Sequence, residues 1–551
     1  MITALIIFII TYLFIGLRQI PRLHIDRPAG ALVGAILMIV FGVLTLDQAF
    51  GAIDMHTLLL LLGMMIITVY LRTAGFFELM ADKMLSLAKT PLQLLILVVL
   101  SSGLLSALFV NDTICLLYTP IILEVTVQLG VNPMPYLLAL ATSSNIGSVM
   151  TVTGNPQNML IGIYSKIPYL SFFARLFPVA IAGFVVCIAV IWLVYRKEMK
   201  AGAFPARPAM PRYHVRKVLL VKSLLVCAGV LVSFSLGHPY ALTAAAGAVV
   251  LLLTGRVRTE KILEGVDWTL LAFFAGLFVV MHGVEESGLA RVAIQWIGDL
   301  STFHPVGRIA GLSLVSVVLS NIVSNVPAVM LLKPLTLSLG GGHIIWLALA
   351  MSSTLAGNLT LIGSVANLIV VQQARKRVEI GFMEYFRVGA LITAMTIAIG
   401  IAVLAVEVKL AGGAEAIAAE KPRQLSSVTI TPSDHRSEPR TFSIVLICDT
   451  EDARAQGLQG FRRLHANEAA LFVFEKPEVV TFWMGSVAYP IDIIFLGFDK
   501  KVVRVHPNCR PGSRDIYDSG KPAAWVLETA AGSGIRVGDG GEFYRKLEKQ
   551  R

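Results

Sequence analysis

The sequence predicts a polytopic α-helical membrane protein with two inverted repeats, re-entrant hairpins and discontinuous helices, followed by a small, mainly-β domain. The first observation is composition: the 551 residues are 56% hydrophobic and 15% charged, and the mean hydropathy is +0.75. Soluble proteins carry about 25% charged residues. The second observation is a duplicated pattern of Ser, Thr, Gly and Asn within two apolar segments. The third is an abrupt change of composition after residue 410.

Many apolar runs are long enough to cross a bilayer, which takes about 20 residues of α-helix. We expect spans near residues 2–20, 29–46, 57–74, 136–165, 173–195, 217–236, 240–254, 268–284, 343–373 and 385–409. Two further apolar regions, 92–129 and 306–340, are each divided by a short tip, Phe109–Thr113 (FVNDT) and Ser324–Pro327 (SNVP). Each region is either a pair of crossings or a re-entrant hairpin.

Loop charges constrain these two regions and are satisfied by re-entrant hairpins, because basic residues collect on the cytoplasmic side of membrane proteins. The connection 196–217 carries seven basic residues against the single acidic Glu198, whereas the loop 47–56 has acidic residues and no basic one. These and the other loop charges agree only if each tip region contributes an even number of crossings. The halves, about 1–195 and 217–409, then cross an odd number of times each, as inverted repeats do. The last span therefore ends outside the cytoplasm.

The duplicated pattern reads LALATSSNIGSVMTVTGNPQN at 138–158 and LALAMSSTLAGNLTLIGSVAN at 347–367. Both copies place TxxGxxxN after an apolar run with two serines. The tips also match, because Asn111 and Asn325 each precede a proline by nine residues. Lipid cannot satisfy loose backbone groups, so a broken spanning helix must line a cavity or bind a ligand. Matched breaks in two halves indicate a transporter's binding site.

The expected site combines helix ends with polar side chains. Half-helix N-termini suit an anion, while unwound carbonyls and side-chain oxygens suit Na⁺. The candidate ligands are Asn111, Asp112, Thr113, Ser144, Asn145, Thr151, Gly154, Asn155 and Asn158 in the first half, and Ser324, Asn325, Ser353, Thr354, Asn358, Thr360, Gly363 and Asn367 in the second. Na⁺ is the candidate metal at the same residues. Alternatively, these residues only join helices, as small and hydroxyl residues do in membranes.

Two charged residues near the tips have alternative roles. Asp112 lies at the first tip, where a carboxylate is costly and is by default functional. It either holds Na⁺ or carries a proton, or else it caps the following half-helix. Lys333 follows the second tip, and we expect its side chain to extend to the membrane surface rather than to contact substrate.

The composition after residue 410 indicates a second domain. Residues 411–440 are small, polar and proline-containing, which predicts a linker. From 441 to 551, short apolar runs such as TFSIVLI and IDIIFLGF alternate with Gly, Pro and Asp, which predicts a small β domain. We expect this domain to be extracytoplasmic, since the last span ends there. The sequence leaves open whether Cys448 and Cys509 form a disulfide.

Within about residues 1–410, the motifs FVNDTICLLYTP, TVTGNPQNMLIG, SNVPAVMLLKP and AGNLTLIGSVANLIVV resemble the ion transporter superfamily. The resemblance is to its arsenite permeases, sodium–proton antiporters and divalent-anion symporters. It implies inverted repeats, a homodimer with an elevator motion, and transport of dicarboxylates, citrate, sulfate, arsenite or silicate, or Na⁺/H⁺ exchange. Dicarboxylate symporters of this superfamily carry Ser-Asn-Thr at both tips, whereas this chain reads NDT at 111–113 and SNV at 324–326. Inorganic oxyanions and antiport therefore stay open.

The last segment resembles the bacterial domain of unknown function 192 through ARAQGLQGF, ALFVF, FWMGSVAYPIDIIFLGFDKKVVRVH and AWVLETAAGSGIRVGD. Members usually read FWMKNT where this chain has FWMGSV, so the Lys, Asn and Thr are replaced by Gly485, Ser486 and Val487. Asp492 does match the family, and its alternative role is a strand-end residue bonded to a loop. Such domains are commonly exported, in agreement with the loop charges.

The leading hypothesis is a secondary active transporter in the bacterial plasma membrane that moves a small anion, an inorganic oxyanion or a carboxylate, by alternating access in symport with Na⁺ or H⁺. One alternative is a Na⁺/H⁺ antiporter in which Asp112 carries the proton. Another is a membrane anchor for an exported binding domain. We expect no enzymatic activity, no cofactor beyond Na⁺ and no nucleic-acid partner, because the net charge of +11 lies largely in loops beside the spans. No GxxxxGK[ST] motif occurs, so ATP drive is unsupported.

Overall fold

The computed structural model describes residues 1–16, 26–200, 202, 204, 215–289, 300–339, 342–375, 377–410, 425–433, 438–449, 451–459, 461–485, 487–497, 499–513 and 515–545. The chain forms two compact units, Met1–Ala419 and Glu420–Arg551. Residues 17–20 of the first predicted span, 411–424 of the predicted linker, and Ser486 lie outside the described residues.

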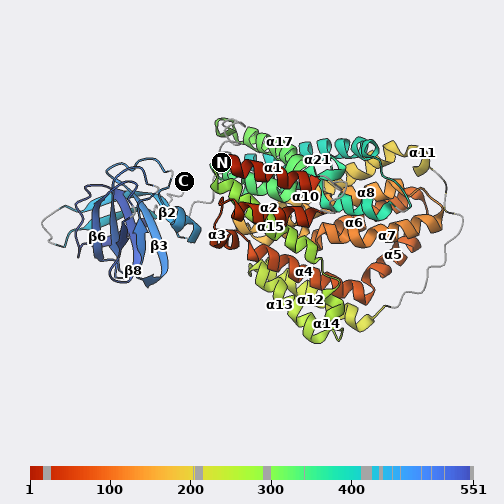
Figure 1. The fold of residues 1–551 in the computed structure, drawn as a ribbon, viewed down its shortest axis with the longest axis horizontal. Helices are drawn as coiled ribbons and strands as arrows, with labels where there is room; N and C mark the ends of the chain where they lie inside the picture. Colours follow the sequence, from red (N-terminus) through yellow and green to blue (C-terminus); the bar gives the residue numbers. More distant parts are fainter. Residues whose placement is uncertain are drawn as a thin grey trace. The chain divides into compact units, whose positions relative to one another are not determined.

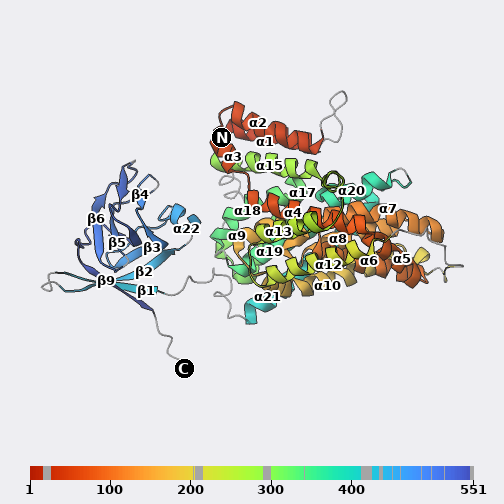
Figure 2. The same ribbon diagram turned by 90° about the horizontal axis from the view of Figure 1, so that it is seen from below.

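The first unit is helical (Figures 1 and 2). Its first half contains α1 (Ile2–Gly16), α2 (Arg27–Val40), α3 (Leu46–Gly51), α4 (Met55–Ala74), α5 (Phe76–Leu87), α6 (Pro91–Leu108), α7 (Asn111–Leu129), α8 (Met134–Ser148), η1 (Val152–Gly154), α9 (Pro156–Ser165), α10 (Tyr169–Val194) and α11 (Arg196–Met199). Its second half contains α12 (Lys217–Ser235), α13 (Tyr240–Thr254), α14 (Thr259–Leu263), α15 (Trp268–Glu286), η2 (Leu300–Thr302), α17 (Pro305–Val323), α18 (Asn325–Ser338), α19 (His343–Ala356), η3 (Leu361–Gly363), α20 (Val365–Ala374) and α21 (Phe382–Leu410).

Eight of the described helices are long and apolar enough to cross a membrane: α4, α6, α7, α10, α12, α15, α17 and α21. Many of their large apolar side chains, such as Val185 and Leu225, are exposed at the surface of the unit, as expected where lipid replaces water. Together with the β domain described below, these helices confirm the predicted fold class. They also confirm that both tip regions are helical hairpins, α6–α7 and α17–α18, and that both polar segments interrupt helices.

The two halves place their helices in the same order. The pair α1–α2 corresponds to α12–α13, the hairpin α6–α7 to α17–α18, and the broken helix α8–α9 to α19–α20. The halves also exchange contacts: α2 packs against α15 of the second half, and α13 packs against α4 of the first. Both views show α1 and α2 beside α15 (Figures 1 and 2).

Each of these two helix contacts between the halves depends on a glycine that packs against the backbone of an alanine. A Cβ added to Gly63 on α4 would lie 2.7 Å from the carbonyl carbon of Ala244 on α13. A Cβ added to Gly276 on α15 would lie 2.8 Å from the carbonyl carbon of Ala31 on α2. Small residues allow backbones to approach this closely in membranes. The same glycine-to-alanine contact therefore occurs twice, at corresponding positions of the two halves.

Local sequence explains the ends of the first hairpin. Thr90 accepts a hydrogen bond from the backbone N–H three residues further on, and Pro91 occupies the first helical position of α6. Gly130 ends α7 in the left-handed conformation, with φ +66°. Only Phe109 and Val110 separate the two helices, so the turn at the tip is tight.

The second unit is mainly β. Its elements are β1 (Leu425–Thr431), β2 (Arg440–Cys448), α22 (Glu451–Gln456), β3 (Glu468–Glu478), β4 (Thr481–Trp483), β5 (Ile491–Leu496), β6 (Val502–Cys509), β7 (Ile516–Asp518), β8 (Ala523–Ala530) and β9 (Gly540–Arg545). Seven strands form one sheet in the order β6-β5-β8-β3-β2-β1-β9, and β4 pairs with β7. The pair β2–β3 is parallel, and the other pairs are antiparallel.

The structure corrects one sequence-based boundary. Strand β1 lies inside 411–440, the range predicted as a linker, and pairs with both β2 and β9. The prediction missed it because LSSVTIT is short and stands in polar surroundings. Its alternate residues Val428 and Ile430 are buried in the sheet core, which is the period-2 pattern of a strand.

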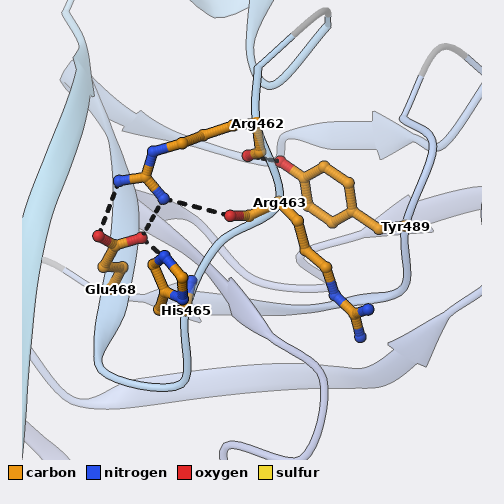
Figure 3. A network of polar contacts seen from close by, with 5 residues as sticks. All are labelled: Arg462, Arg463, His465, Glu468 and Tyr489. Atoms are coloured by element: carbon orange, nitrogen blue, oxygen red, sulfur yellow. Dashed lines mark hydrogen bonds and ion pairs between the residues drawn. The ribbon is translucent and has the colours of Figure 1, made fainter.

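Polar contacts hold the segment that leads into β3 (Figure 3). Arg462 donates through Nη1 and Nη2 to Glu468 Oε2 and Oε1 at 2.7 and 2.8 Å. The His465 N–H donates to Oε2 at 3.0 Å, and the Tyr489 hydroxyl donates to the Arg462 carbonyl at 2.8 Å. The Arg462 guanidinium lowers the pKa of Glu468 to about 2. This bidentate pair fixes the start of the strand.

Asp492 also fixes neighbouring segments of the β domain through hydrogen bonds. It is buried, and its Oδ1 accepts the Asn508 N–H at 2.7 Å. Its Oδ2 accepts the N–H groups of Gly532 and Ser533 at 3.0 and 2.7 Å and the Ser533 hydroxyl at 2.7 Å. The carboxylate thus joins the end of β6 to the loop that follows β8, which favours the structural alternative for this residue. Both Cys448 and Cys509 are buried free thiols.

Candidate functional site

The two helix breaks have the same backbone shape. In the first half, α8 ends at Ser148, and α9 begins at Pro156. A short 3₁₀ turn lies between extended residues, Thr151 with φ −135° and ψ 155° and Asn155 with φ −160° and ψ 161°. In the second half, a 3₁₀ turn lies between Thr360 with φ −132° and ψ 160° and Ser364 with φ −140° and ψ 141°. One structural device is therefore built twice.

The last Asn of each TxxGxxxN motif closes its break. Asn158 Nδ2 donates to the carbonyls of Ser148 and Thr151, both at 3.0 Å. Asn367 Nδ2 donates to the carbonyls of Gly357 and Thr360 at 2.6 and 3.1 Å. These carbonyls lost their helical partners at the break and need another donor in a membrane interior.

The Thr and Gly of the motif fix the break against the hairpin. The Thr151 hydroxyl donates to the Ala107 carbonyl on α6, and the Thr360 hydroxyl donates to Asn321 Oδ1 on α17 at 2.9 Å. A Cβ added to Gly154 would clash with the Ser148 backbone, and one added to Gly363 would lie 2.7 Å from Asn321 Oδ1. No side chain fits at either glycine without movement of a neighbour. Sequence reasoning missed Asn321, whose only signal is an Asn inside the apolar α17.

Asn145 joins the two halves at the centre of the unit. Its Nδ2 donates to Asn358 Oδ1 at 2.9 Å and to Asn367 Oδ1 at 3.2 Å. Its Oδ1 accepts from Asn111 Nδ2 at 2.8 Å and from the Ser364 hydroxyl at 3.1 Å. All of these side chains are buried. The first hairpin tip and the second broken helix therefore meet at one amide group.

Thr354, which aligns with Asn145 in the duplicated pattern, makes the reciprocal contacts. Its hydroxyl oxygen accepts from Asn155 Nδ2 at 3.2 Å and from Gln157 Nε2 at 3.3 Å, and the hydroxyl donates to Asn158 Oδ1 at 3.3 Å. Asn145 reaches Ser364 and Asn367, and Thr354 reaches their counterparts Asn155 and Asn158. The contacts between halves are thus symmetric, although the side chains differ.

A small pocket lies where both tips meet both second half-helices. Its residues are Asn111, Asp112, Pro156, Gln157, Phe273, Phe274, Ser324, Asn325, Val326, Pro327, Ser364 and Val365. Four of them, Asn111, Pro156, Asn325 and Val365, are the first residues of α7, α9, α18 and α20. Four helix N-termini therefore converge on one pocket, and each directs a positive dipole end toward it. The pocket's volume of about 20 Å³ is enough for about one water-sized group.

Polar atoms at the first tip are incompletely paired. Asn111 Oδ1 is buried and has no hydrogen-bond partner among the described residues. Asp112 is 7% exposed, and the backbone N–H of Ala366, at the start of α20, faces its carboxyl group. At the second tip, Asn325 donates to the carbonyls of Ser353 and Gly363 at 3.0 and 3.2 Å when its amide nitrogen faces them. The two tips therefore differ in what they offer a ligand.

The predicted residues separate into three groups. Asn111, Asp112, Ser324 and Asn325 line the pocket. The following predicted residues support the breaks and their contacts instead, away from the pocket lining: Asn145, Thr151, Gly154, Asn155, Asn158, Ser353, Thr354, Asn358, Thr360, Gly363 and Asn367. Thr113 and Ser144 are not part of the lining, and the Ser144 hydroxyl bonds the Ala141 carbonyl and the Cys115 thiol.

Sequence reasoning missed Gln157 and the two phenylalanines of α15, because they lie outside the matched positions or differ between the copies. Lys333 does not line the pocket, and its Nζ lies 4.3 Å from the centre of the Tyr164 ring on α9. Within the described residues, no group of three or more His, Cys, Asp or Glu side chains is placed to hold a metal ion.

Similarity to known proteins supports a transporter. Residues 4–351 match the citrate transporter family, and residues 433–540 match the uncharacterised domain of unknown function 192. The silicon efflux transporter LSI3 of Oryza sativa subsp. japonica is 33% identical over 451 residues, 70% of this chain and 93% of LSI3. The putative transporter arsB of Dictyostelium discoideum is 26% identical over 513 residues, 72% of this chain and 91% of that protein.

Among solved structures, the Alcanivorax borkumensis YdaH transporter aligns with a TM-score of 0.44 and 14% identity, covering 76% of this chain and 99% of that one. The family match spans more than half of the chain, and the similarity to LSI3 extends over most of both proteins. The chain therefore belongs to the citrate transporter family of the ion transporter superfamily, joined to a C-terminal domain of unknown function 192.

Proposed function

We propose that the first unit is a secondary active transporter that moves a small anion, an inorganic oxyanion or a carboxylate, across the bacterial plasma membrane. The observation that carries this proposal is the convergence of four helix N-termini on one buried pocket. Their N–H groups can satisfy an anion without a formal positive charge. The names of the citrate transporter family and of the silicon efflux transporter LSI3 fit a small oxygen-rich solute.

The arrangement of the halves supports a mechanism of alternating access. The pocket is too small for citrate in this conformation, so binding requires the hairpin tips to separate from the broken helices. The reciprocal contacts of Asn145 and Thr354 suit a motion in which one half changes against the other. We infer that the halves are inverted repeats, that the protein acts as a homodimer, and that the C-terminal domain lies outside the cytoplasm, as the loop charges predict.

We propose that anion transport is coupled to Na⁺ or H⁺ at the first hairpin tip. The unpartnered Asn111 Oδ1 can coordinate Na⁺, and the neighbouring Asp112 carboxylate can either share that ion or take a proton. A negative Asp112 would oppose an anion in so small a pocket. Neutralisation by Na⁺ or H⁺ would therefore favour anion binding, which links the two solutes thermodynamically.

Uptake by proteoliposomes that contain the full chain tests the proposal. Sulfate, citrate, dicarboxylates, arsenite and silicic acid are offered with an imposed Na⁺ gradient, an imposed pH gradient or no gradient. We expect accumulation of at least one anion that depends on one gradient. If every anion stays outside while Na⁺ drives proton movement, the anion transporter is wrong.

The second candidate is a Na⁺/H⁺ antiporter, which the position of Asp112 in the pocket favours. It predicts proton movement driven by a Na⁺ gradient in the absence of any other solute. Asp112→Asn should then abolish the exchange, because the amide cannot carry the proton. If the variant exchanges Na⁺ for H⁺ as fast as the native protein, the antiporter hypothesis is excluded. A simple membrane anchor requires neither the paired breaks nor the pocket.

A further inference from the structure

The second unit contains a pocket of its own, unrelated to the transport site. It has a volume of about 430 Å³, within the range of small-molecule sites. Its wall combines the end of α22, strand β4, part of β3 and one residue of β8. Four aromatic side chains line it: Phe472, Phe474, Phe482 and Trp483.

Glu528 lies in the wall of this pocket, and its Oε2 lacks a hydrogen-bond partner among the described residues. It stands in the middle of β8, paired with Ala470 of β3 and Ile493 of β5, and is only 5% exposed. Its Oε2 has no hydrogen bond within the described part of the chain, and Glu528 takes part in none of the ion pairs found there. A buried carboxyl group without a donor is costly. The fold therefore retains a group that a ligand can satisfy.

Arg454, the cation that lines the same pocket, is occupied elsewhere. Its Nη1 donates to the carbonyls of Asp449 and Val473 at 3.1 and 2.9 Å. Its guanidinium lies over the Phe474 ring, 5.0 Å from the centre. The remaining aromatic faces belong to Phe472 and Phe482, whose rings meet edge to face at 4.9 Å, and to Trp483, which is 57% exposed at the rim.

We propose that this pocket binds a small organic ammonium ion, whose N–H groups reach the Glu528 carboxylate and whose apolar part contacts Phe472, Phe482 and Trp483. Aromatic faces and a carboxylate attract the same charge. An ammonium group supplies the hydrogen-bond donors that Glu528 lacks. A neutral alcohol would gain less, and a carboxylate would be repelled once Glu528 ionises.

Ionisation of Glu528 should be linked to this binding. Burial raises its pKa to about 8, so at neutral pH the group is mostly protonated, and a cation must displace the proton. The other ionisable groups around it are Cys448, Tyr489 and Cys509, whose pKa values are also raised by burial, together with Arg454 and Glu478 in the pocket wall. Below pH 8, cation affinity should therefore rise by up to about tenfold per pH unit.

Calorimetric titration of the full chain in zwitterionic lipid nanodiscs tests the proposal, with n-butylammonium, n-butanol and butyrate as probes. We expect n-butylammonium to bind at least tenfold more tightly than either of the others at pH 8, with proton release, and to weaken about tenfold at pH 7 and again at pH 6. Equal binding of all three probes, or cation binding that is independent of pH, would overturn the proposal.

Three variants assign the effect to this pocket. Glu528→Gln should lower n-butylammonium affinity at least tenfold and remove its pH dependence, whereas Glu438→Gln, an exposed residue outside the pocket lining, should change neither. Trp483→Leu changes an exposed ring, so this variant should fold and can test the pocket even if Glu528→Gln unfolds. It should weaken the binding of n-butylammonium several-fold more than the binding of n-butanol. If Trp483→Leu, or a folded Glu528→Gln, binds n-butylammonium as tightly as the native protein, the assignment of binding to this pocket is contradicted.

Discussion

The two broken helices share their shape but not the residues that face the pocket. The identical pairs Thr151/Thr360, Gly154/Gly363 and Asn158/Asn367 all support the backbone of the break, and none of these six residues lines the pocket. The aligned pairs that do contribute to the lining differ: Pro156 corresponds to Val365, and Gln157 to Ala366. Within the two broken helices, the residues that are identical therefore support the break, and the residues that line the pocket differ.

The hairpin tips share one pocket residue and differ in the next one. Asn111 and Asn325 are equivalent first residues of α7 and α18, but Asp112 corresponds to Val326. The residue before each Asn also differs: Val110 has φ −59°, whereas Ser324 has φ +74° and ψ 163°, a region that is nearly restricted to glycine. The second tip is strained and uncharged, and the first is relaxed and acidic.

The largest expected effect comes from a methyl group at the shared glycine. Gly154→Ala would clash with the Ser148 backbone, whereas Gly363→Ala meets first the amide end of Asn321, which can move. We expect losses of unfolding free energy of about 3 and about 1 kcal/mol respectively, measured by thermal unfolding in detergent. Equal losses would show that the two breaks tolerate change alike, contrary to the packing.

The contacts that Asn145 and Thr354 make between the halves should contribute unequally to the stability of the protein. Asn145→Ala removes four hydrogen bonds, and Thr354→Ala removes three weaker ones. Because buried partners are left unsatisfied, we expect destabilisation of about 3 kcal/mol for Asn145→Ala and about half of that for Thr354→Ala. The same unfolding assay checks both variants. A smaller effect at Asn145 than at Thr354 would contradict its central role.

The smallest effect concerns the strained tip. Ser324→Gly should stabilise the protein by about 1 kcal/mol, because glycine adopts a positive φ without a steric penalty. The matched change Val110→Gly should instead destabilise the protein, because Val110 has a negative φ and its buried side chain would leave a cavity. A gain of stability in Ser324→Gly and a loss in Val110→Gly, both measured by thermal unfolding, would confirm the asymmetry of the tips. A loss of stability in Ser324→Gly would refute it.

Much of this architecture could be predicted from the sequence. Apolar run lengths and the duplicated TxxGxxxN predicted the hairpins and both breaks, since lipid imposes strict rules on backbone groups. The roles of single residues were harder to predict. Asn158 and Asn367 were expected as ligands, but their amide groups satisfy carbonyls of the break itself. Gln157 escaped notice because a search for repeated residues cannot find a position that differs.

Strand β1 was missed for another reason. Its seven residues alternate only weakly and stand next to a polar, proline-containing stretch. Their pairing depends on β2 and β9, the latter more than 100 residues away in sequence. Glu528 was likewise unremarkable in the sequence, because only the packing of β8 between β3 and β5 shows that its carboxyl group is buried.

The central claim is that the pocket residues of the broken helices, which differ between the halves, bind the transported solute. The most direct test is the KM for anion uptake in proteoliposomes that contain Gln157→Leu, which alters a buried pocket residue, or Gln372→Leu, an exposed residue on α20 outside the pocket lining. We predict that Gln157→Leu raises the KM at least tenfold without lowering the unfolding temperature by more than a few degrees, while Gln372→Leu leaves the KM unchanged. An unchanged KM in Gln157→Leu would contradict the account.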